Sequence, residues 1–163
     1  MTTNWKRLAA LLTFALTLCV FGLIIGYTGE QGDLEGWEKN SGYNNLYDLA
    51  QKDKLKGVVV DIKTIIPLPG MTPGVGLIVR SSKDREVPVH LGPRSFLNLN
   101  YLWSMKGADV KVRGVWAQIN GETVFIAAKI KSKTQVLKLR STRDGRPLWT
   151  MTPKELAMER TLE

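Results

Sequence analysis

The residues best suited to chemistry in this sequence are basic side chains near its C-terminal end. Seven positive charges fall within 18 residues, against Asp144 as the one acid. These are Lys129, Lys131, Lys133, Lys138, Arg140, Arg143 and Arg146. The first three alternate along the chain, as do Lys138 and Arg140, so a strand would present each set on one face. The pattern predicts a basic face that binds an anionic partner, and a solvated basic surface that aids solubility is the alternative.

His90 is the sole histidine and the one candidate for a metal ligand or general base. As a ligand it would need partners, and only Asp84 and Glu86 lie nearby in the sequence. As a base it would need a nucleophile and an orienting group, and beyond Ser95 nothing suggests a triad. The favoured interpretation is a histidine that forms hydrogen bonds at a strand end. We therefore predict no catalytic residue, no metal site and no cofactor, and a protein that is not an enzyme.

An uncharged apolar run from Leu8 to Tyr27 follows two basic residues. About 20 such residues at ~1.5 Å each match a bilayer core of roughly 30 Å, so 8–27 predicts a single transmembrane helix. The run is longer than a signal-peptide core and ends without the small residues of a cleavage site, which favours a retained anchor. Basic residues stay cytoplasmic, so 1–7 should lie inside and everything after residue 28 in a periplasm or lumen.

Two glycines and one cysteine within this run indicate how the chain could pair and which cysteine chemistry it lacks. Gly22 and Gly26 have the spacing of close helix pairs and are candidates for a dimer contact. Glycine is frequent in membrane spans in any case, which is the simpler explanation. Cys19 is the only cysteine, so the chain can form no internal disulfide, no Cys-x-x-Cys-His haem site and no cysteine-rich zinc site.

Charge divides the rest of the chain, whose overall net charge is +8. Residues 28–54 carry six acids and three bases, whereas residues 55–163 carry a net charge of +9. We expect an acidic stalk over 28–54, with a short helix near residues 46–54, followed by a basic folded domain over 55–150. A basic domain attracts anions, and its extracytoplasmic address argues against nucleic acid as the partner.

Hydrophobic alternation predicts strands over residues 56–66, 75–80, 87–91, 109–119, 122–131 and 136–140. Asn120-Gly121 predicts a type I′ hairpin turn, because both central positions of that turn need positive φ. Phe96, Leu99 and Trp103 repeat at helical spacing, which predicts a short helix between the third and fourth strands.

The order strand, strand, strand, helix, strand, strand is that of an OB-fold. We predict a mainly β chain in which a single N-terminal transmembrane helix precedes a small OB-like β-barrel, with one short helix between strands 3 and 4. Another small β-barrel or sandwich is the alternative. Thr152, Pro153 and Glu155 have the pattern of an N-cap, a proline at N1 and a capping glutamate, which predicts a short C-terminal helix or tail over 151–163.

Several short motifs mark the stretch from Val87 to Trp149, at residues 89–93, 96–97, 107–114, 120–121, 126–130, 137–140 and 144–149. With the single N-terminal span, this stretch resembles the MamS group of magnetosome membrane proteins. The resemblance implies a magnetosome membrane address, a domain in the vesicle lumen and a part in magnetite crystal growth. A related magnetosome group carries Cys-x-x-Cys-His haem motifs, which this sequence lacks, so the redox activity of that group cannot be carried over to this chain.

Together these observations predict a non-enzymatic, membrane-anchored binding or scaffolding module outside the cytoplasm. The resemblance makes it a magnetosome-lumen factor in the growth and maturation of magnetite crystals. Its expected partners are the membrane, other membrane or lumenal proteins, and an anionic surface, which membrane, mineral or protein could each supply. A small accessory subunit of a larger membrane protein complex is the alternative function.

Overall fold

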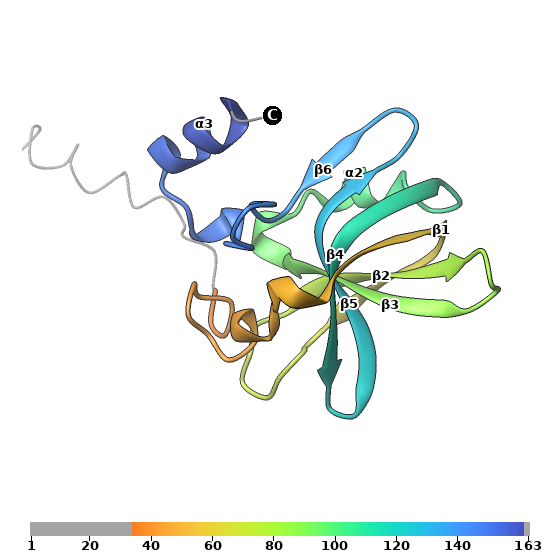
Figure 1. The fold of residues 1–163 in the computed structure, drawn as a ribbon, viewed down its shortest axis with the longest axis horizontal. Helices are drawn as coiled ribbons and strands as arrows, with labels where there is room; N and C mark the ends of the chain where they lie inside the picture. The colour runs from red at the N-terminus through yellow and green to blue at the C-terminus, as the bar shows by residue number, and fades with distance from the viewer. Residues whose placement is uncertain (1–33, 162–163) are drawn as a thin grey trace, which may run out of the picture. The chain divides into compact units, whose positions relative to one another are not determined.

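The computed structural model describes residues 34–161 (Figure 1). The predicted transmembrane helix over 8–27, with Gly22 and Gly26, lies outside the described residues. Within residues 34–161, no helix is both long enough and apolar enough to cross a membrane.

Six strands are the main regular elements of the described chain. They are β1 (Lys52–Ile65), β2 (Gly74–Ser81), β3 (Glu86–Pro93), β4 (Asp109–Ile119), β5 (Glu122–Lys131) and β6 (Val136–Lys138). Asn120 and Gly121 join β4 to β5 with φ angles of 51° and 81°, as the predicted type I′ turn requires. The mainly β class that alternation predicted is therefore confirmed.

Helical segments are short. The α-helices are α2 (Leu99–Trp103) and α3 (Pro153–Thr161), and the 3-10 helices are η1 (Asn44–Leu46), η2 (Leu49–Gln51), η3 (Arg94–Phe96) and η4 (Leu148–Thr150). The helix predicted between the third and fourth strands is α2, which begins after the side chain of Asn98 caps the Tyr101 amide at 3.1 Å.

The strands form one sheet in the order β3-β2-β1-β4-β5-β6, and neighbours in this order pair antiparallel. In addition, β3 pairs parallel with β5 through Val89 opposite Phe125 and His90 opposite Ile126. Leu55 of β1, Val112 of β4 and Ile130 of β5 occupy one cross-strand row and all point into the core. Their neighbours along each strand must therefore point outward.

The segment from Leu34 to Gln51 packs against the strands, which corrects the acidic stalk predicted over 28–54. Trp37 and Tyr43 are fully buried members of the core. The indole Nε1 of Trp37 donates to the carbonyl oxygen of Thr72 at 2.9 Å, and that of Trp149 donates to the carbonyl oxygen of Trp37 at 2.9 Å. The acidic composition concealed these two aromatic anchors, and the domain includes residues before 55. The helix expected near 46–54 is replaced by η1 and η2, and β1 starts at Lys52.

The C-terminal helix α3 begins with the capping box that the sequence predicted. The Thr152 amide donates to Oε2 of Glu155 at 2.8 Å, and the Glu155 amide donates to Oγ1 of Thr152 at 3.4 Å. These reciprocal bonds satisfy amides that have no partner inside the helix.

Candidate functional site

Arg140 lies inside the protein and is no part of an exposed basic face. It is fully buried, and its guanidinium carbon lies 4.9 Å from the ring centroids of both Tyr47 and Trp149. Nη2 donates to Oδ1 of Asn44 at 2.7 Å and Nη1 to the carbonyl oxygen of Gly145 at 3.3 Å. Arg140 therefore ties the N-terminal segment to the C-terminal one, and its predicted place on the binding face is wrong.

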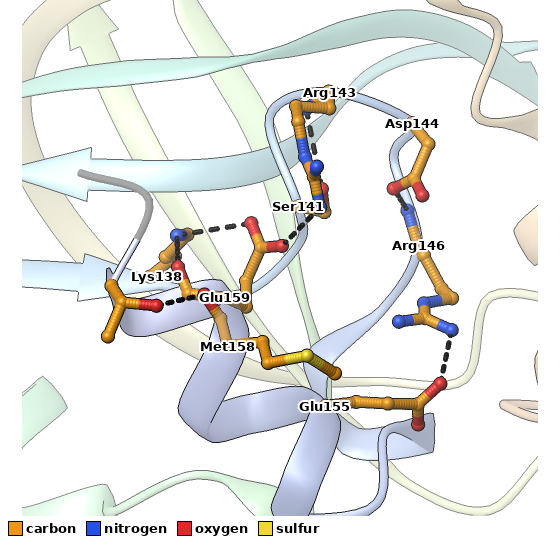
Figure 2. A network of polar contacts seen from close by, with 9 residues as sticks. Lys138, Ser141, Arg143, Asp144, Arg146, Glu155, Met158 and Glu159 are labelled. Carbon is orange, nitrogen blue, oxygen red and sulfur yellow. Dashed lines mark hydrogen bonds and ion pairs between the residues drawn. The ribbon is translucent and has the colours of Figure 1, made fainter.

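Three further cations of the predicted face hold α3 in place, as Figure 2 shows. Oε1 of Glu159 lies 3.2 Å from Nζ of Lys138, and its Oε2 lies 3.2 Å from Nη2 of Arg143. Arg146 Nη1 donates to Oε1 of Glu155 at 2.7 Å. Glu159 is buried, so its pair with the largely buried Lys138 is shielded from water, whereas Arg143 is 65% exposed. Together the three contacts form a clamp on a helix whose apolar residues are few. All three side chains therefore form ion pairs with carboxylates of α3.

The remaining predicted cations are Lys129, Lys131 and Lys133. Lys133 is exposed in the turn between β5 and β6. Lys129 and Lys131 lie on β5, opposite Arg113 and Lys111 of β4 respectively. The structure thus brings two of the seven predicted residues together with cations that the sequence analysis did not select.

Cations from three strands form two rows across the outer face of the sheet. One row runs Lys56, Lys111, Lys131 and the other Lys54, Arg113, Lys129, across β1, β4 and β5. We call these six residues the basic platform. They alternate with inward-pointing residues such as Leu55, Val112 and Ile130, which is why all six share one face.

The basic platform places like charges opposite each other on neighbouring strands, and their repulsion opposes folding. Like charges directly opposite each other on neighbouring strands are destabilising. Within residues 34–161, no carboxylate forms an ion pair with Lys111, Arg113 or Lys131. Asp109 lies two residues before Lys111 on the same strand and adds one negative charge at the margin. The arrangement suits binding of an anion better than stability of the free protein.

Two hollows adjoin the platform, and Arg113 lines both of them. A hollow of about 210 Å³ is bordered by Lys111, Arg113, Lys129 and Lys131. A larger one of about 460 Å³ has Lys54 and Asp53 on its border. The Asp53 carboxylate accepts a hydrogen bond from Nε1 of Trp116 at 2.9 Å, and this bond is the main cause that lowers the pKa of Asp53.

His90 occupies a buried position in β3, where it stacks on Tyr43 with ring centroids 6.0 Å apart. Within the described part of the chain its Nδ1 has no hydrogen-bond partner, so the hydrogen bonding predicted for this histidine is not made by that atom. Burial lowers the pKa of His90 to about 4, so the ring is neutral at ordinary pH. The two acids considered as fellow ligands, Asp84 and Glu86, both pair with Arg80. No group of three His, Cys, Asp or Glu side chains within residues 34–161 is placed to hold a metal ion.

Comparison with known proteins gives one match. A sequence model of the MamS/MamX magnetosome protein family matches residues 51–137, which is more than half of the chain. The chain belongs to the MamS/MamX magnetosome protein family. None of the curated proteins and none of the solved structures matches it. Membership of the MamS/MamX family confirms the resemblance seen in the sequence and associates the protein with the magnetosome.

The MamS/MamX match contains all six residues of the basic platform and ends before Arg140 and the α3 clamp. The sequence analysis did not select four platform residues as binding residues: Lys54, Lys56, Lys111 and Arg113. Their i, i+2 spacing was a usable signal, the same one that selected Lys129 and Lys131. What the sequence did not contain was the register that sets the three strands side by side.

Proposed function

We propose that this chain is a non-enzymatic binding or scaffolding module of the magnetosome, anchored through residues 8–27 with its domain in the vesicle lumen or periplasm. Membership of the MamS/MamX family supports the magnetosome role. In this proposal the domain takes part in growth and maturation of the magnetite crystal by engaging an anionic surface or partner.

We further propose that the domain is a small OB-like barrel. The parallel pairing of β3 with β5 supports this, because it links two strands that are not neighbours in the sheet order. The position of α2 between β3 and β4 also fits an OB-like arrangement. OB-folds bind extended ligands across a strand face, and the basic platform lies on such a face.

The observation that carries the proposed function is the basic platform itself. Six cations lie in two cross-strand rows, and among the residues that the structure describes, 34–161, three of them form no ion pair with a carboxylate: Lys111, Arg113 and Lys131. A surface of this kind raises the local concentration of anions and speeds their encounter with the protein. The seven-residue face predicted from the sequence is replaced by a face on β1, β4 and β5.

Affinity purification of the full-length chain from its native membrane tests this proposal. The wild type is compared with the triple variant Lys54→Gln, Lys56→Gln and Lys111→Gln, and with a control that removes charge elsewhere, Lys63→Gln with Lys83→Gln. We expect magnetosome components to co-purify with the wild type and the control and to be lost from the triple variant. Equal recovery of the same components with the triple variant would refute a platform-based function.

The second candidate, an accessory subunit of a larger membrane complex, is favoured by exposed apolar side chains. Trp103 is 54% exposed and Ile66 is 60% exposed. Large exposed apolar residues of this kind are common at protein interfaces. In the same purification, stoichiometric partners that stay bound to the triple variant but leave on Trp103→Ser would favour the subunit function.

A further inference from the structure

Four platform residues surround one hollow, and their chemistry is specific enough to suggest the class of ligand. Lys111 and Arg113 come from β4, and Lys129 and Lys131 from β5, around a space of about 210 Å³. From this arrangement we infer that the hollow is a binding site for a phosphate group, a ligand class that deepens the proposed anion-binding function and rests on it.

The geometry of the four cations favours a phosphate group over a carboxylate. A phosphate monoester carries about −1.5 to −2 charges at neutral pH and three acceptor oxygens, whereas a carboxylate has one charge and two oxygens. Arg113 provides a planar guanidinium that can bind two oxygens at once, and the lysines provide point charges around it. A ligand with several oxygens can therefore contact both strands, and its charge offsets the repulsion of Lys111 with Lys131.

The surroundings of the hollow strengthen this site. Lys54 and Lys56 of β1 continue the two rows beyond Arg113 and Lys111 and add positive potential without lining the space. Asp109 is the carboxylate that shares this face of β4; it lies two residues before Lys111 and does not line the hollow. The local excess of positive charge is thus large enough for a ligand of two negative charges.

Calorimetric titration of the full-length chain in a phosphate-free nonionic detergent tests the inference. One arm adds inorganic phosphate, with acetate at equal ionic strength as the comparison anion. The other arm adds short-chain phosphatidic acid to the micelles, which presents the same phosphate monoester as a lipid headgroup. The variant is Lys111→Gln with Lys131→Gln, and the control is Lys63→Gln with Lys83→Gln, whose residues do not line the hollow.

We expect saturable binding at one site per chain, weakened about tenfold or more in the hollow variant and unchanged in the control. Binding of inorganic phosphate identifies the free ion as a source, and binding confined to the lipid arm identifies the headgroup; either result supports the site. Equal competition by acetate, equal loss in both double variants, or no saturable binding in either arm would overturn it. Circular dichroism of each variant establishes that it is folded.

A second pair of substitutions separates this inference from the proposed function. Lys54→Gln with Lys56→Gln alters the platform outside the hollow. If phosphate never binds but magnetosome components are lost from this variant during purification, the phosphate site is wrong and the proposed function stands. If phosphate binds at the hollow but every platform variant recovers the same components, the proposed function is wrong.

Discussion

The platform predicts that one charge reversal will stabilise the protein while removing its binding. Lys111 lies on the central strand β4, directly opposite Lys56 on one side and Lys131 on the other. Lys111→Glu turns two repulsive cross-strand pairs into attractive ones. Reversing one exposed pair from repulsion to attraction changes the folding free energy by on the order of 0.5 kcal/mol, so the two pairs together stabilise the fold by about 1 kcal/mol. For a domain of this size, that gain raises the melting temperature by roughly 3–5 °C.

Thermal unfolding of the full-length chain, followed by circular dichroism at low salt and at about 1 M salt, measures this effect. The gain should shrink at high salt, because the Debye length there is only about 3 Å. Lys83→Glu, in the turn between β2 and β3, provides the matched control and should give no comparable gain. A variant Lys111→Glu that melts lower than the wild type, or a gain that salt leaves unchanged, would refute the electrostatic reasoning.

Three other perturbations have defined outcomes. Glu159→Gln should loosen α3 by about 1–2 kcal/mol, because the clamp loses its charge, and limited proteolysis should then cut near α3 earlier than in the wild type. The folded-state pKa of His90 is about 4, below its unfolded value of ~6.5, so stability should fall as pH drops from about 6.5 to 4, by at most ~1.4 kcal/mol per unit. His90→Phe should flatten that slope in denaturant titrations, and an unchanged slope would contradict this assignment. Gly114→Ala should destabilise the fold by about 1–3 kcal/mol, since its Cβ would collide with the carbonyl oxygen of Ile126 across β4 and β5; a wild-type melting temperature would argue against this packing.

Local patterns predicted most of the strands because each pattern is completed within a few residues. Alternation of Val110 and Val112 with Lys111 and Arg113 indicates one buried and one exposed face without knowledge of the partner strand. The Asn120-Gly121 turn and the capping box of α3 are equally local. The segment 34–51 was misjudged because its aromatic residues are buried by contacts far along the chain: Trp37 contacts Thr72 and Trp149, and Tyr43 contacts His90 and Arg140.

The sequence predicted only part of the candidate site, again because contacts between distant segments decide which side chains are exposed. Charge spacing selected Lys129 and Lys131 correctly as outward neighbours, but it treated Arg140 as their equivalent. Burial of Arg140 depends on Asn44 and Tyr47, which are more than 90 residues earlier in the sequence. Likewise, the contribution of Lys54 to the platform depends on the register between β1 and β4. Periodicity within a strand contains no information on that register.

The most direct test of the central claim replaces the native chain by the variant Lys54→Glu, Lys56→Glu and Lys111→Glu in cells that form magnetosomes. Electron microscopy then measures the size and shape of the magnetite crystals, while immunoblots of purified magnetosomes establish that the variant is present in normal amount. If the basic platform is the functional surface, the crystals should be altered in the same way as in a strain that lacks the protein. Crystals of wild-type size and shape, with the variant present at its normal level, would contradict that claim.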